Sequence, residues 1–372
     1  MVNVFLFGTL CWPLLLNRVA GKTCPEARAA VLEGFKVSRA KNQNFPTIQK
    51  VASEKTEGIL LQNCDETVVS RLDHYESGFG YHLHPVKLWV NHEEVNAQVY
   101  LPPDSVEAGG HWDLKKWAKQ HGELILEAAV EVMALQGVKS ASEMADCYPM
   151  MLVRADARIN ARKKPSPPSS STLALEDVDL HSRSQPYTKF FAVNEAVVSI
   201  PKFSGGKMEN LTRAGFVGSD AAIILPYDPK TDRILLIEQF RFGPFLREDA
   251  NPWILEPIAG RIDPGEAPEK AACREAMEEA GLAIYDVHRV HSGYVSPGIS
   301  TEYFHVFIGL ADIKEDSAIL GGLSSESEDI KGHVMNFKDF FSMLQQGKLP
   351  VSPLALAGYW LASNRSKLRN NS

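Results

Sequence analysis

The segment that decides how the second half of this chain is interpreted is Gly260–Leu282, which reads GRIDPGEAPEKAACREAMEEAGL. Pro268 lies near its start and Gly281 near its end, an arrangement that is typical of helix start and stop. We therefore expect a helix over Glu266–Ala280. The helix would end in an unusually acidic turn.

Three carboxylates crowd the end of this helix. At 3.6 residues per turn, Glu275 lies one turn from Glu278 and Glu279. Like charges at this spacing, and acids at the negative end of the helix dipole, each cost about a few tenths of a kcal/mol. A divalent cation held between them would offset that cost, and hard oxygen ligands suit Mg²⁺ or Mn²⁺. The residues alone leave a second interpretation open, a solvated acidic face.

The whole segment resembles the Nudix box, Gly-x5-Glu-x7-Arg-Glu-U-x-Glu-Glu-x-Gly-U, at every fixed position. The resemblance implies an α/β/α sandwich that hydrolyses a nucleoside diphosphate linked to another group. It also implies ligands for Mg²⁺, with Mn²⁺ as the alternative: the carboxylates of Glu275, Glu278 and Glu279 and the backbone carbonyl of Ala259. Glu279 is thereby also a catalytic candidate. Structural roles fall to Gly260, to Glu266, which braces the loop, and to Arg274, which orients the carboxylates.

Outside the box the chain is similar to the ADP-ribose pyrophosphatase branch of this family. The segments that carry the similarity are Ile237–Arg241, Trp253–Glu256, Ser296–Gly298 and Ser325–Ile330. The implied reaction is ADP-ribose plus water giving AMP and ribose 5-phosphate. Another nucleotide sugar or a dinucleotide is the alternative substrate. The same branch implies a homodimer.

Further site residues follow from that similarity by position. Glu326 is the candidate base that activates water, and Glu328 would support its loop or a metal. The candidate substrate-binding residues are Phe190, Arg213, Arg241, Glu256 and Pro297. Arginines would hold the phosphates and phenylalanine the adenine, with Glu256 near the terminal ribose. Each also has an ordinary explanation: a solvated arginine, a core phenylalanine, a turn proline or a solvated acidic loop.

The N-terminal part carries a second, looser resemblance. Val4–Leu10 and Arg71–Tyr81 together resemble the γ-glutamylcyclotransferase-like (AIG2-like) fold, a small mixed β-barrel. The resemblance implies that Gly8, Thr9 and Leu10 cradle the substrate and that Glu76 is a general acid/base. Burial would raise the pKa of such a carboxyl group toward neutrality. Phe7 replaces the tyrosine usual in this family, so a ligand-binding module and a structural Glu76 remain alternatives.

The composition along the chain predicts a multidomain α+β protein. We expect a cyclotransferase-like domain over residues 1–105, a helical segment over 106–160, a linker over 161–180 and a Nudix domain over 181–372. The linker contains KKPSPPSSST, which is too polar and proline-rich to pack. We expect the helical segment to pack between domains or against a second subunit. The whole resembles tellurite-resistance-associated Nudix fusions.

Periodicity predicts the secondary structure. The expected N-terminal elements are strands Val4–Phe7, Gly58–Leu61, Val86–Val90 and Ala97–Leu101 and a helix in Asp65–Leu72. The expected C-terminal strands are Ala221–Pro226, Ile234–Gln239, Trp253–Ile258, Glu302–Leu310 and His333–Phe337, with helices Phe340–Gln346 and Ser352–Asn364. The apolar start is expected to form a buried strand followed by a turn.

The overall composition is that of an ordinary globular protein in a reducing compartment. The chain is 44% hydrophobic with a formal net charge of −7 and has no basic run, which disfavours nucleic-acid and membrane binding. The 5 cysteines are scattered, so neither a disulfide framework nor a zinc site is expected. No apolar run is long enough to span a membrane. We therefore expect a cytoplasmic protein.

Overall fold

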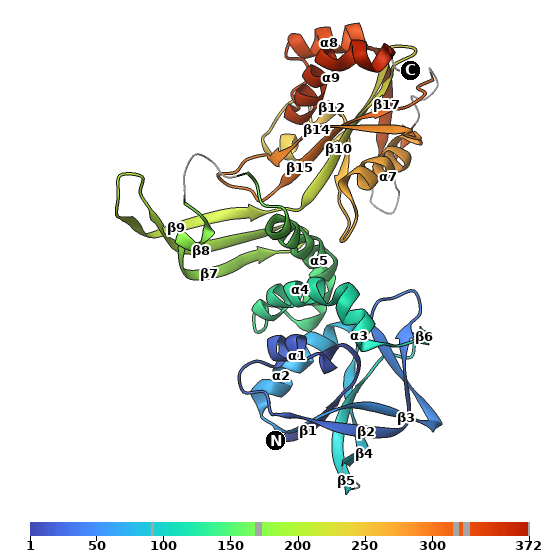
Figure 1. The fold of residues 1–372 in the computed structure, drawn as a ribbon, viewed down its shortest axis with the longest axis vertical. Helices are drawn as coiled ribbons and strands as arrows, with labels where there is room; N and C mark the ends of the chain where they lie inside the picture. Colours follow the sequence, from blue (N-terminus) through green and yellow to red (C-terminus); the bar gives the residue numbers. More distant parts are fainter. Residues whose placement is uncertain (91–92, 168–172, 315–319, 323–327, 371–372) are drawn as a thin grey trace. The chain divides into compact units, whose positions relative to one another are not determined.

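The computed structural model describes residues 1–90, 93–167, 173–314, 320–322 and 328–370. The chain forms two compact units (Figure 1). The first comprises Met1–Pro165 together with Gln185–Ala192, and the second comprises Ser166–Ser184 together with Val193–Ser372. No helix among the described residues is both long and apolar enough to cross a membrane.

The first unit contains a closed β-barrel with both parallel and antiparallel strand pairs. Its strands are β1 (Val2–Leu6), β2 (Ala27–Ala40), β3 (Pro46–Cys64), β4 (His82–Val90) and β5 (Glu93–Leu101), with β6 (Ala108–His111) added at the edge. The order β3-β1-β5-β4-β2 closes because β2 also pairs with β3. The β1–β5 pair is parallel and the remaining pairs are antiparallel. The mixed barrel expected from the resemblance is confirmed.

Alternating apolar residues fill the barrel. Phe5, Leu32, Leu60, Leu88 and Val99 come from five different strands and are almost fully buried in one cluster. Strand β2 was not predicted from the sequence, because its N-terminal half is a run of alanines and charges without a clear period of two. Pairing along nearly its whole length with β3 compensates for that weak pattern.

Helices pack on this barrel within the first unit. They are α1 (Pro13–Ala20), α2 (Glu66–Glu76), α3 (Leu114–Trp117), α4 (Glu123–Ala134) and α5 (Ala141–Lys163), with a π-helical turn at Ala118–Gly122. Short 3-10 helices lie at Gly8–Cys11 and Ser77–Phe79.

The buried strand expected at the chain start is confirmed as β1, and the turn after it is the 3-10 helix Gly8–Cys11, which leads into α1 at Pro13. The expected packing of the helical segment between domains or against a second subunit is wrong. The helical segment contributes Val132, Met144 and Met151 to the same buried cluster as Leu6 of the barrel, so it is part of this unit's own core. The apolar side chains of α4 and α5 are buried by packing against the barrel.

A small sheet follows the helices along the chain. A 3-10 turn at Leu175–Asp177 leads into β7 (Asp179–Thr188), β8 (Ala192–Pro201) and β9 (Lys207–Val217), which form a three-stranded sheet in the order β7-β8-β9. The sequence analysis did not foresee these strands; the side chains of β7 and β9 are largely exposed and polar.

An eight-stranded sheet forms the centre of the second unit. Its main path is β14 (Asp286–Tyr294), β15 (Tyr303–Leu310), β10 (Asp220–Asp228), β11 (Arg233–Phe240), β17 (Ile330–Asn336) and β16 (Leu320–Gly321). Strands β12 (Trp253–Glu256) and β13 (Ile258–Arg261) pair with β11 and β10 respectively. The helices are α6 (Phe242–Leu246), α7 (Pro268–Ala280), α8 (Phe337–Gln345) and α9 (Ser352–Asn370).

Both faces of this sheet are covered by helices (Figure 1). Ile223 and Leu225 of β10 pack with residues of α8 and α9, whereas Ala222 and Ile224 pack with the alanines of α7. Alternate side chains of β10 therefore point to opposite faces of the sheet and pack in two separate cores. The expected α/β/α sandwich is confirmed. The expected single strand Trp253–Ile258 is wrong, because the chain turns after Glu256 and the two halves pair with different strands.

Candidate functional site

Helix α7 buries one carboxylate, that of Glu279, against the sheet. Its buried residues are Ala271, Ala272, Ala276 and Glu279, and the small alanines let the helix backbone approach the strands closely. Gly281 ends the helix in the left-handed conformation, and the N–H of Leu282 donates to the carbonyl of Ala276 at 3.0 Å. The acidic turn is therefore fixed against β13 rather than frayed.

Glu279 is the most deeply buried of the acidic residues in this turn. It is 3% exposed, and one carboxylate oxygen accepts a 3.4 Å hydrogen bond from the N–H of Ala259 on β13. Burial raises the pKa of Glu279 to about 9, and the carboxylates of Glu275 and Glu328 add to the shift. The site therefore gathers more negative charge than its own surroundings neutralise.

Glu275 lies against bare backbone. A Cβ placed on Gly260 would lie 1.9 Å from Oε1 of Glu275, which no side chain allows. The glycine that opens the motif therefore permits the carboxylate of α7 to reach strand β13.

Arg274 connects the acidic turn to the loop before α7. Its Nε and Nη2 donate to the two carboxylate oxygens of Glu266 at 3.1 and 3.0 Å, a two-point contact. Its Nη1 donates to Glu275 at 2.7 Å and to Glu278 at 2.9 Å. The hydrogen bonds from Arg274 lower the pKa of Glu266. This geometry agrees with the orienting and bracing roles expected for Arg274 and Glu266.

A second ion pair lies beside the carboxylate turn. Arg241, at the start of α6, donates from Nε to Glu256 at 2.6 Å. Burial raises the pKa of Glu256, and Arg241 counteracts part of that shift. Arg241 also lowers the pKa of Glu279 through its charge, so the guanidinium acts on the acidic turn as well. The structure thus brings Arg241 and Glu256 together next to the helix end.

The donor set fits a hard divalent cation. The groups that meet here are carboxylates, the ligand type that Mg²⁺ and Mn²⁺ prefer, and the N–H of Ala259 donates to one of them. A buried acidic group whose pKa is raised by its acidic neighbours is stabilised by such a charge. Within the described part of the chain, no three acidic, histidine or cysteine side chains already stand in a metal-ligating arrangement. Arg274 pairs with two of the carboxylates instead.

For two other predicted residues, Arg213 and Pro297, no contact with this cluster is found among the described residues. Arg213 is exposed on β9 and donates to the neighbouring carbonyl of Thr212. Pro297 is exposed in a turn after β14. Phe190 belongs to the first unit, where its carbonyl accepts from Arg154. Glu326 lies outside the described residues.

The sequence reasoning missed an exposed aromatic cluster beside Arg241. Phe240 lies 5.4 Å from Trp253 and 5.8 Å from Phe245, between ring centroids, and Phe242 stacks on Phe245 at 5.7 Å. All four rings are well exposed. The signal in the sequence was the density of aromatic residues around Arg241, in a segment where the sequence analysis singled out Arg241 but not its aromatic neighbours.

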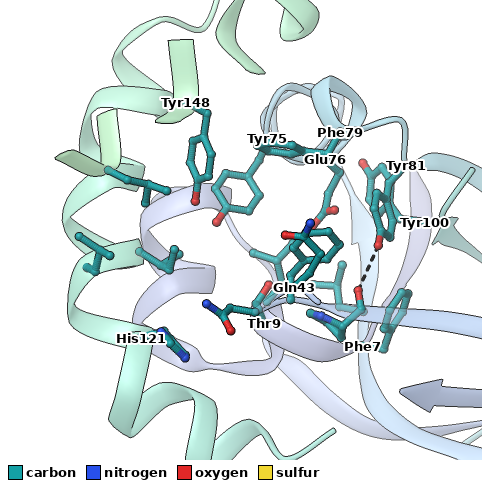
Figure 2. A pocket seen from close by; sticks show the side chains of 18 of the residues that line it. Phe7, Thr9, Gln43, Tyr75, Glu76, Phe79, Tyr81, Tyr100, His121 and Tyr148 are labelled. Atoms are coloured by element: carbon teal, nitrogen blue, oxygen red, sulfur yellow. Dashed lines mark hydrogen bonds between the residues drawn. The ribbon is translucent and has the colours of Figure 1, made fainter. Parts of the chain in front are cut away.

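The first unit contains a separate cavity of about 420 Å³. Its lining includes Phe7, Thr9, Leu10 and Glu76, which the sequence analysis had singled out in two distant segments (Figure 2). Loss of water contact raises the pKa of Glu76 to about 7. Among the described contacts no hydrogen bond reaches the Glu76 carboxylate, so it is available to a ligand.

Gly8 supports this cavity without lining it. Its φ of +72° lies in the left-handed region, and a Cβ there would lie 2.2 Å from Pro46. Glycine therefore allows the loop after β1 to turn into its 3-10 helix while Pro46 packs against it. Thr9 and Leu10 follow directly, and Leu10 is almost entirely buried.

Two family models match the chain. The model described as "NUDIX domain" matches residues 219–354 and contains the carboxylate helix. The model described as "Gamma-glutamyl cyclotransferase, AIG2-like" matches residues 4–119 and contains Glu76.

Curated relatives match over the part that holds the carboxylate helix. The chain is 34% identical over 199 residues to an "ADP-ribose pyrophosphatase" of Escherichia coli (strain K12), covering 54% of this chain and 94% of that protein. It is 32% identical over 198 residues to an "ADP-ribose pyrophosphatase" of Haemophilus influenzae, covering 53% and 91%. It is 29% identical over 160 residues to a "GDP-mannose pyrophosphatase" of Pectobacterium atrosepticum, covering 43% and 81%.

Proposed function

Because the chain belongs to the Nudix family and carries an AIG2-like γ-glutamyl cyclotransferase domain at its N-terminus, we propose that its C-terminal unit is a Mg²⁺-dependent ADP-ribose pyrophosphohydrolase. The products would be AMP and ribose 5-phosphate. The observation that carries the proposal is the buried Glu279, whose pKa is raised to about 9 beside Glu275 and Glu328. Such a concentration of acid is costly to the fold unless a cation compensates it.

Glu275, Glu278 and Glu279 would hold the metal, together with the backbone of Ala259. When bound, Mg²⁺ would neutralise the pyrophosphate and polarise water toward hydroxide. Arg274 keeps the carboxylates oriented through its contacts to Glu275 and Glu278. We assign the removal of the water proton to Glu326 and the support of its loop to Glu328.

Substrate contacts follow from the charges around the helix. Arg241, held by Glu256 at 2.6 Å, would donate to the pyrophosphate, and Arg213 and Pro297 would complete the substrate contacts. We assign adenine stacking to Phe190 and the terminal ribose to Glu256. The similarity to proteins named for ADP-ribose, at higher identity and coverage than those named for GDP-mannose, favours ADP-ribose as the substrate.

The test is product analysis with the full chain. We expect AMP from ADP-ribose with Mg²⁺ and no product with a chelator, and a lower kcat/KM for GDP-mannose and for dinucleotides. Glu279→Gln should lose turnover by about a hundredfold or more, as expected for a metal ligand. Glu269→Gln on the same helix is the control, because that side chain is partly exposed and pairs with Arg289 away from the cluster. Equal turnover in Glu279→Gln and the wild type would refute the metal role.

For the N-terminal unit we propose γ-glutamyl cyclotransfer, on the strength of one observation. The Glu76 carboxylate faces a cavity, and burial raises its pKa to about 7, which suits a group that takes up and returns a proton. The test is release of 5-oxoproline from a γ-glutamyl amide, with Glu76→Gln as the inactive variant. Absence of 5-oxoproline with every γ-glutamyl amide would leave the domain as a binding module.

A further inference from the structure

One wall of the N-terminal cavity comes from outside the region that matches the cyclotransferase family. That match ends at residue 119, whereas His121, Leu124, Ile125, Tyr148 and Leu152 also line the cavity. These five residues come from the π-helical turn, α4 and α5, which we call the cap. The cap is therefore this chain's own contribution to the shape and chemistry of the site.

The cap is built into the first unit rather than resting loosely on it. A Cβ on Gly122 would lie 2.8 Å from the ring of Trp12, so the π turn closely approaches the residue that begins α1. Trp12 in turn meets Trp117 edge-on at 6.0 Å. A Cβ on Gly78 would lie 2.3 Å from the carbonyl of Ala141, at the start of α5. The cap is thus fixed directly beside the turn that follows Glu76.

The π turn has a local effect that points to the cavity. An i→i+5 turn inside a helix displaces the side chains around it, and such turns occur frequently at functional sites. Here the turn contains His121, which lines the cavity, and Gly122, which provides the close approach to Trp12.

The cavity is chemically divided. The 3-10 helix after β1, the turn after β2 and helix α2 supply hydrogen-bonding groups at Thr9, Gln43 and Glu76. The cap supplies the hydrocarbon side chains Leu124, Ile125 and Leu152, beside the polar groups of His121 and Tyr148. Figure 2 shows the hydroxyls of Tyr75 and Tyr148 directed into the cavity near Glu76. No contact described for the chain gives either hydroxyl a hydrogen-bond partner.

The charge of the lining limits what can enter. None of the described residues around the cavity is a lysine or an arginine, and its carboxylate is Glu76. A phosphate, or a second carboxylate at the cap end, would find no lysine or arginine to pair with, only the imidazole of His121, and would lose much of its hydration. An apolar group at the cap end loses no hydrogen bonds and gains burial. A volume of about 420 Å³ lies in the range of pockets that hold a small organic molecule.

We propose that the cap selects the amine half of a γ-glutamyl amide and that this amine is apolar, an alkyl or aryl amine. The γ-glutamyl half is taken from the cyclotransfer proposed above and would lie at Thr9 and Glu76. The apolar half would lie against Leu124, Ile125 and Leu152, with the Phe79–Tyr148 pair, 5.0 Å between centroids, at its side.

The step is balanced without any further reactant. The α-amine nitrogen bonds to the γ-carbonyl carbon, the bond from that carbon to the leaving amine breaks, and 5-oxoproline and a free amine result. Glu76 takes the proton from the attacking nitrogen and returns it to the leaving nitrogen. The apolar wall receives the leaving amine's side chain, so the cap governs specificity while Glu76 governs the chemistry.

The experiment compares two γ-glutamyl amides on the full chain, γ-glutamyl anilide and γ-glutamyl-glycine, by 5-oxoproline release and by calorimetric binding. We expect at least about a tenfold preference for the anilide, the size of effect that a few apolar atoms produce. Leu124→Asn, of similar volume but polar, should reduce the preference to near one. Val130→Asn on the same helix is the matched control, because Val130 is 43% exposed and does not line the cavity.

The outcomes separate this inference from the cyclotransfer proposal. One outcome is that no amide is turned over, that the anilide binds at least about tenfold more tightly than the glycine amide, and that Leu124→Asn removes this difference in affinity. That result would contradict cyclotransfer and support the selection of an apolar amine by the cap. Equal kcat/KM and equal affinity for the two amides in the wild type would overturn the inference. So would a preference that Leu124→Asn leaves unchanged in a variant whose circular dichroism matches the wild type.

Discussion

The Oε1 atom of Glu275 lies 1.9 Å from the position that a Cβ on Gly260 would take. The helix carboxylate and the strand backbone therefore occupy adjoining space, and neither can move without the other. The motif glycine and the motif glutamate, fifteen positions apart, are one structural unit. This relationship makes the cluster of acidic residues sensitive to a single methyl group.

Gly260→Ala should disrupt the metal site with limited effect on the rest of the fold. The added methyl group must displace Glu275 from β13, so we expect Mg²⁺ affinity and ADP-ribose turnover to fall about tenfold to a hundredfold. Overpacking of this kind also destabilises by about 1–3 kcal/mol. Isothermal calorimetry with Mg²⁺ and urea denaturation measure the two effects. Gly243→Ala is the control, because nothing lies within 4 Å of its Cβ position; equal losses in both variants would contradict the steric argument.

The stability of the metal-free protein should fall as pH rises from about 5 to 9. The pKa of Glu279 is raised from an ordinary value of 4.5 to about 9, so the folded state binds more protons than the unfolded state across that window. The penalty for ionising this buried group grows as pH approaches the folded pKa. Thermal denaturation at several pH values, with chelator present, measures it. Glu279→Gln should flatten the dependence, and an unchanged slope in that variant would assign the effect to another group.

Binding of Mg²⁺ should release a proton near pH 7.5. A cation beside Glu279 favours its ionised form, and the group is largely protonated in the metal-free protein at that pH because its pKa is about 9. Calorimetric titrations in two buffers of different ionisation enthalpy give the number of protons released. A value near one is expected for the wild type and near zero for Glu279→Gln. No release in the wild type would mean that Glu279 does not meet the metal.

A buried ion pair holds the end of β7 to the helices of the first unit. Arg154 is 1% exposed and Glu131 is 6% exposed; Arg154 contacts Glu131 through two nitrogens and donates to Thr188 Oγ1 at 3.2 Å. Arg154→Leu should destabilise the first unit by about 3–5 kcal/mol, because it leaves the buried carboxylate of Glu131 with a longer, 3.6 Å ion pair to Arg158 in place of its main partner. Lys163→Leu, which breaks the exposed pair with Glu123, should cost at most about 1 kcal/mol. Similar urea midpoints for the two variants would contradict the difference in burial.

Cyclotransfer should rise with pH through about 7. Glu76 must be ionised to accept the proton of the attacking amine, and burial raises its pKa to about 7. Tyr75, Tyr81, Tyr100 and Tyr148 face the same cavity with pKa values raised by burial, so they stay protonated across this range. His121 is the other titratable group in the lining. The kcat/KM profile for γ-glutamyl anilide measures the rise, and loss of the step near pH 7 in His121→Gln would assign it to the histidine.

Part of the site could be read from local sequence alone. Glu275, Glu278 and Glu279 share a helical end because the α-helix has a fixed period, and Gly281 marks its stop. The strands of the second sheet were predictable because Ile223, Ile224 and Leu225 lie between turn signals. By contrast, β2 and β7 carry alanines, charges and exposed polar residues, and only their pairing partners make them strands.

The sequence by itself determined the chemistry of this protein: an acidic helix end with hard ligands, and Glu76 as the candidate acid/base of the N-terminal domain. The tertiary structure decided which of those groups are buried from solvent. Glu279 is buried rather than Glu278 because three alanines bring one face of α7 against the sheet. The Glu76 cavity receives an apolar wall because α4 and α5 fold onto the barrel. Burial depends on contacts between segments that are far apart in the sequence, and the local spacing of residues does not indicate those contacts.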